Sequence, residues 1–108
     1  MTLDEYQDNC ITTAIYPPEV GIIYTSLGLC SEAGEVADKI KKSIRDKEGD
    51  LDQADLDGIA KELGDVLWYV ATMANELDLS LGEIAQKNLD KLRSRAEREV
   101  LTGSGDDR

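Results

Sequence analysis

The sequence predicts an all-α fold, an antiparallel bundle of four helices, from three observations. Apolar residues recur three or four positions apart through most of the 108 residues, as they do along one face of a helix. No stretch alternates polar and apolar residues as a strand does, and no glycine-rich phosphate loop is present. The chain has no Phe, and a core of Leu, Ile, Val and Ala suits the packing of helices on helices.

The first two predicted helices follow local start and stop patterns. Thr2 and Glu5 form a capping-box pattern for a helix that ends before Tyr16-Pro17-Pro18. A long amphipathic helix is then predicted from about Ile22 to near Asp46. The charged segment 47–52 contains Gly49, a helix stop, and is predicted to be a loop.

The other two helices complete one domain. The third is predicted to begin around Asp55 or Asp57 and to carry its apolar stripe to Leu77. Ser80 and Glu83 form a second capping box, so the fourth runs to about Val100. The sequence therefore predicts a single domain over residues 1–101, followed by a flexible tail, residues 102–108.

Composition restricts the partners and the location of the protein. The formal charge of −11 argues against a general nucleic-acid binder. It allows a nucleotide polyphosphate if divalent cations lie between the two sets of negative charge. A chain this short buries a limited core, so we expect a homodimer or homotetramer.

The sequence shows no signal peptide and no membrane span, which predicts a cytoplasmic protein. With no His and no C-x-x-C, a zinc site is excluded, and Cys30 is predicted to be buried among apolar residues.

An acidic motif occurs twice, as Glu32-Ala33-Gly34-Glu35-Val36 and as Glu62-Leu63-Gly64-Asp65-Val66. Residues three apart share a helix face, so each copy points two carboxylates the same way. One such pair alone is usually a solvated face, but if the two helices pack antiparallel, the two copies can face each other across a groove. Four converging carboxylates need bridging cations, and oxygen ligands suit Mg²⁺, with Mn²⁺ as a substitute. The glycine in each copy suggests close approach of backbone or substrate.

At these motifs the sequence resembles the MazG-like branch of the all-α nucleoside triphosphate pyrophosphohydrolases, whose signature is E-x-x-E, a spacer and E-x-x-D. The resemblance spans nearly the whole chain. It implies cleavage of a (d)NTP between its α and β phosphates into (d)NMP and pyrophosphate, in nucleotide-pool control or house-cleaning. It also implies specific site residues. The metal ligands are Glu32, Glu35, Glu62 and Asp65, while Tyr69, Asn88 and Lys91 contact the nucleotide.

Three details of this site stay open in the sequence. Some relatives carry an additional Glu immediately before the first motif residue, where this chain has Ser31, so the number of metals and the general base are unspecified. Glu35 is our choice for the catalytic base. Lys91 and Arg95, one turn apart, are predicted to hold phosphates, although pairing with nearby acids is an equal alternative for Lys91. A purine deoxynucleotide is the working hypothesis for the substrate.

Two other classes of protein compete with this interpretation. A carboxylate-bridged di-iron bundle also uses paired glutamates, but it normally needs E-x-x-H motifs, and the chain has no His. A non-catalytic acidic helical module, which binds a basic partner through its charge, would leave the repetition of the two motifs unexplained.

Overall fold

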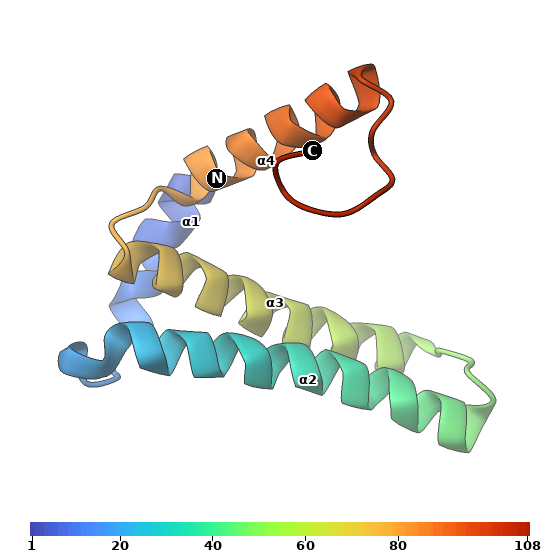
Figure 1. Ribbon diagram of the computed structural model, residues 1–108. Coiled ribbons are helices and arrows are strands. Elements are labelled where there is room, and N and C mark those ends of the chain that lie inside the picture. The colour runs from blue at the N-terminus through green and yellow to red at the C-terminus, as the bar shows by residue number, and fades with distance from the viewer.

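Helices α2 (Gly21–Lys47) and α3 (Gln53–Glu76) form a long antiparallel hairpin, the main packing unit of the computed structural model (Figure 1). The structure describes all residues 1–108 and contains four α-helices, two short 3-10 helices and no strand. The all-α prediction is therefore confirmed. No helix combines the length and the apolar character needed to span a membrane.

The helix ends follow local capping chemistry. Helix α1 (Leu3–Cys10) begins at Thr2, whose hydroxyl accepts a hydrogen bond from the Glu5 backbone N–H, and two 3-10 helices (Ile11–Thr13 and Pro18–Val20) lead to α2. Helix α4 (Leu81–Glu97) begins after Ser80, the second predicted cap. Helix α3 begins earlier than predicted because Asp52 and Asp55 form a reciprocal capping box.

Helix α1 fastens the start of α4 to the end of α3. The buried Gln7 side chain donates to the Leu79 carbonyl at 2.8 Å and accepts from the Leu81 N–H at 2.9 Å. Asp4 accepts from both the Ser80 hydroxyl and the Gly82 N–H, so α4 has a carboxylate from α1 at its N-terminus. These bonds set the direction of α4, which diverges from the hairpin (Figure 1). Within one chain, only α2 and α3 pair along their length as the predicted bundle requires.

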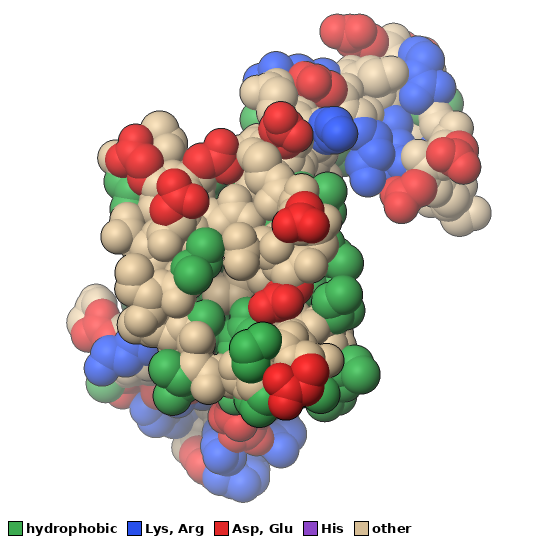
Figure 2. All heavy atoms as spheres, turned by 90° about the vertical axis from the view of Figure 1, so that its left-hand side faces the viewer, with side chains coloured by type: hydrophobic (Ala, Val, Ile, Leu, Met, Phe, Trp, Pro, Cys, Tyr) green, Lys and Arg blue, Asp and Glu red, His purple; other side chains and the backbone are tan.

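The single chain leaves much of its apolar surface uncovered. Only 10 of 108 residues are buried, and the small core cluster (Cys10, Ala71 and Leu81) lies where α1, α3 and α4 meet. The radius of gyration is 16.8 Å, whereas a compact chain of this length has about 13 Å. Hydrophobic side chains reach the surface between the acidic ones (Figure 2). The prediction that Cys30 is buried is wrong, since its place on α2 is exposed when no second element covers that face.

Candidate metal centre

Three carboxylates from the two acidic motifs converge between α2 and α3. Glu32 projects from α2, while Glu62 and Asp65 project from α3, and one oxygen of each lies within 4.8 Å of the others. Glu32 and Glu62 are half-buried and Asp65 is exposed. The antiparallel pairing of the helices thus brings both motifs to one place.

The cluster places several negative charges around Glu32, which disfavours its charged form. Partial burial raises the pKa of Glu32, and the hydrogen bond with Glu62 and the charges of Asp65, Glu62 and Glu35 raise it further. The nearest cation is Lys39, whose Nζ lies 3.7 Å from a Glu62 oxygen. Lys39 on α2 thus forms a salt bridge with Glu62 on α3. One lysine leaves most of the cluster's charge uncompensated.

The fourth predicted ligand occupies a different position. Glu35 is exposed on α2, one turn after Glu32, and is not part of the converging group. It lies near enough for its charge to raise the pKa of Glu32. Its roles as metal ligand and as catalytic base therefore stay predictions.

An aromatic cavity of about 330 Å³ adjoins the carboxylates. It is lined by Glu32 and Asp65 of the cluster and by Thr13, Trp68 and Tyr69. The Trp68 indole N–H donates to the Thr13 hydroxyl at 3.0 Å, and its ring meets that of Tyr69 edge-to-face at 4.9 Å between centroids. Tyr69 thus lies beside the acids, and its contact with a nucleotide stays a prediction.

Tyr69 also lines a second cavity. It has a volume of about 250 Å³ and is lined by Tyr24, Leu27, Gly28, Ser31 and Tyr69. The Tyr24 and Tyr69 rings lie 6.5 Å apart between centroids. Thr13, Tyr24 and Trp68 were not predicted from the sequence as lining residues. The spacing of Tyr24, Gly28 and Glu32, four residues each, places them along one helix face and was sufficient to find Tyr24.

Close helix approach depends on a glycine outside the acidic motifs. A Cβ at Gly28 would overlap the Tyr69 ring, so the absence of a side chain there lets the ring lie against α2. Around Gly34 and Gly64, the motif glycines, no atom from another part of the chain lies within 4 Å of the position that a Cβ would take. Within the chain they therefore do not serve the close backbone approach that the sequence suggested.

The predicted α4 residues do not join the carboxylates within one chain. None of the residues lining the two cavities comes from α4. Asn88 is exposed, whereas Lys91 and Arg95 form ion pairs with Asp106 of the tail. Their contact with a nucleotide stays a prediction.

The fold and the site define an all-α protein with a carboxylate cluster between two antiparallel helices and an aromatic cavity beside it. Residues 24–100 match the family described as the MazG nucleotide pyrophosphohydrolase domain, and the chain belongs to this family. The Gene 37 protein of Mycobacterium phage L5 is 48% identical over 114 aligned residues, which cover the whole of both chains. No solved structure matches the chain significantly.

Proposed function

We propose that the protein is a metal-dependent nucleotide pyrophosphohydrolase that cleaves a (d)NTP into (d)NMP and pyrophosphate. The observation that carries this proposal is the convergence of Glu32, Glu62 and Asp65 beside the aromatic cavity. Membership of the MazG family supports it, because the family's description names this activity. We further propose that the substrate is a purine deoxynucleotide and that the protein removes unwanted nucleotides from the nucleotide pool.

The donor set fits a magnesium ion. The three carboxylate oxygens lie within 4.8 Å of one another, so a small inward movement of the side chains would bring them to the roughly 3 to 4 Å that separates the oxygens around one Mg²⁺. All three donors are oxygens, which disfavours zinc and iron relative to Mg²⁺ or Mn²⁺. A bound divalent cation would neutralise triphosphate charge and lower the pKa of an attacking water.

The chain's own side chains then hold and orient the nucleotide. The faces of Trp68 and Tyr69 suit stacking with a nucleobase, and a cation held by the adjoining carboxylates would attract the phosphates to the cluster. Glu35, one turn along α2 and outside the converging group, is available to accept a proton from the attacking water. The geometry thus favours its catalytic role over its role as a ligand.

A nucleotide panel tests the proposed activity. The protein is incubated with each (d)NTP and Mg²⁺ or Mn²⁺, and the products are separated by chromatography. We expect monophosphate without diphosphate from at least one nucleotide. The absence of metal-dependent turnover of every nucleotide would favour the alternative, a non-catalytic acidic module on the same scaffold.

Replacing Glu35 with glutamine separates its two predicted roles. Loss of a general base is expected to lower kcat by about 10²- to 10⁴-fold, while the affinity for Mn²⁺, measured by calorimetry, stays within about twofold of wild type. The Mn²⁺ affinity of the variant is expected to be unchanged because Glu32, Glu62 and Asp65 are intact. A parallel loss of Mn²⁺ affinity would instead assign Glu35 as a ligand.

We also propose that the functional unit is at least a homodimer. The chain exposes 7660 Å², whereas a compact monomer of 11.9 kDa exposes about 5,900 Å². The excess, roughly 1,700 Å², is what one subunit buries in an obligate dimer. The helix pair exposes many large apolar side chains: Ile22, Ile23, Leu27, Ile40, Ile44, Leu56, Leu63 and Leu67. A second copy packed on these side chains would complete a four-helix bundle.

Leu63→Glu tests this assembly against a matched control. Leu63 on α3 and Leu101 beyond α4 are each 53% exposed, so the same substitution introduces the same charge at equal exposure. We expect wild type and Leu101→Glu to sediment as dimers or larger assemblies, and Leu63→Glu to dissociate or to unfold at a lower temperature. A wild-type protein that sediments as a monomer at every concentration would exclude the assembly.

A further inference from the structure

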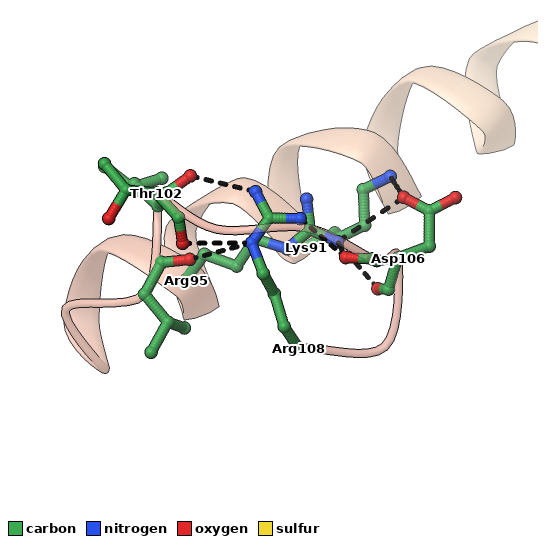
Figure 3. A network of polar contacts seen from close by, with 8 residues as sticks. Lys91, Arg95, Thr102, Asp106 and Arg108 are labelled. Carbon is green, nitrogen blue, oxygen red and sulfur yellow. Dashed lines mark hydrogen bonds and ion pairs between the residues drawn. The ribbon is translucent and has the colours of Figure 1, made fainter.

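The tail, residues 102–108, folds back along α4 and is held there by polar contacts alone (Figure 3). The Arg108 guanidinium donates to the carbonyls of Leu101 at 2.9 Å and of Val100 and Thr102 at 3.2 Å each. Gly103 and Gly105 have φ of +105° and +89°, a conformation that favours glycine. No large apolar side chain occurs in the tail, so little hydrophobic free energy opposes its release.

Asp106 bridges two cations that are one turn apart on α4. A carboxylate oxygen of Asp106 lies 3.2 Å from Lys91 Nζ and 3.4 Å from Arg95 Nη2 (Figure 3). Lys91, and then Arg95, hold the pKa of Asp106 below its usual range. The Asp106 side chain is itself 85% exposed, so water can replace its contacts when it leaves.

Arg95, which the tail covers, is a buried arginine whose hydrogen-bond donors are only partly paired. Its side chain is 6% exposed, although buried arginines normally have paired donors. Its contacts with the tail all use Nη2: the Asp106 carbonyl at 2.6 Å and, at 3.4 Å each, the Gly105 carbonyl and the Asp106 carboxylate. Nε is buried and has no partner. The tail thus leaves unused the forked donor geometry that suits an anion with several oxygens.

We propose that the tail acts as a polar strap: residues 102–108 cover Lys91 and Arg95 and keep ligands away from them. A phosphate-bearing ligand displaces Asp106 from these two side chains. A phosphate group offers oxygens to Lys91 Nζ and to both Nε and Nη2 of Arg95, whereas Asp106 approaches only one nitrogen of each side chain. The nucleoside triphosphate as this ligand rests on the proposed function, and the displacement itself requires only a polyphosphate. The strap lowers apparent affinity, because only molecules with an open tail bind.

Binding of inorganic tripolyphosphate without metal tests the strap in the full chain. Asp106→Asn removes the competing charge, and calorimetry is expected to show binding about three to ten times tighter than wild type. Asp107→Asn is the matched control, because Asp107 is also an acidic tail residue but joins no hydrogen bond or ion pair. It makes the same change in net charge and should leave the affinity within about twofold of wild type.

A double variant identifies the site that the strap closes. Adding Lys91→Met to Asp106→Asn should abolish the gain in affinity. Equal affinities for Asp106→Asn and Asp107→Asn, or no tripolyphosphate binding by any variant, would overturn the proposal. Hydrolysis with Mg²⁺ is measured separately. If the protein binds tripolyphosphate as expected but hydrolyses no nucleotide, the strap proposal stands and the proposed function fails.

Discussion

Asp65→Asn is expected to lower metal-dependent nucleotide hydrolysis by at least about 100-fold. The substitution removes one of the three charges that converge between α2 and α3, while the amide keeps the size of the side chain. Asp65 is exposed, so the helix pair tolerates the change without losing buried contacts. Initial rates with the best substrate of the nucleotide panel measure the effect.

The effect of Asp65→Asn on metal binding can also be measured without turnover, as the gain in stability that Mg²⁺ produces. At Mg²⁺ one hundred times its Kd, wild type should gain about 2.7 kcal/mol in the free energy of unfolding, and Asp65→Asn should gain much less. In EDTA the variant should be at least as stable as wild type, because a like charge beside Glu32 is gone.

Asp8→Asn is the matched control for both measurements. Asp8 is exposed on α1 and joins no hydrogen bond or ion pair, so the same chemical change should leave the rate and the Mg²⁺ response at wild-type values. Equal activity in Asp65→Asn and Asp8→Asn would show that the cluster does not hold the catalytic metal.

Gly28→Ala is expected to lower the free energy of unfolding by about 1–3 kcal/mol. The new methyl group would overlap the Tyr69 ring. That ring cannot swing aside freely, because it packs edge-to-face on Trp68 and beside Tyr24. Either α2 and α3 separate or the aromatic cavity changes shape, so KM for the nucleotide should rise as well. Chemical denaturation and steady-state kinetics measure the two effects.

Gly58→Ala provides the opposite expectation in the same helix pair. A Cβ at Gly58 would lie 3.6 Å from Lys39 Nζ, an ordinary contact. The alanine should therefore stabilise α3 by up to about 1 kcal/mol through its higher helix propensity. If Gly28→Ala leaves stability unchanged or raises it as Gly58→Ala does, the tight contact of Gly28 with Tyr69 does not determine how the helices pair.

Local chemistry made much of the fold predictable from the sequence. The caps at Thr2 and Ser80 were found because a capping side chain and its backbone partner lie three residues apart. The start of α3 was placed too late because Asp52 was assigned to the loop, although Asp52 and Asp55 have the same spacing. The meeting of Glu32 with Glu62 followed from two helical motifs and one antiparallel turn.

Features that depend on tertiary packing were beyond the sequence pattern. Cys30 lies in an apolar stripe, but burial needs a covering element, and the chain supplies none at that place. The direction of α4 depends on the Gln7 side chain, which bonds to residues more than 70 positions away. The contact of Asp106 with Arg95 depends on a glycine-rich turn whose path no periodicity specifies.

Phosphorus-31 NMR of a reaction between the wild-type protein, a substrate (d)NTP and Mg²⁺ tests the central claim most directly. We expect the signals of pyrophosphate and nucleoside monophosphate to grow in equal amounts, and neither product to form when EDTA replaces Mg²⁺. Inorganic phosphate and nucleoside diphosphate as the first products, or a spectrum that stays that of the triphosphate for every nucleotide, would contradict this claim.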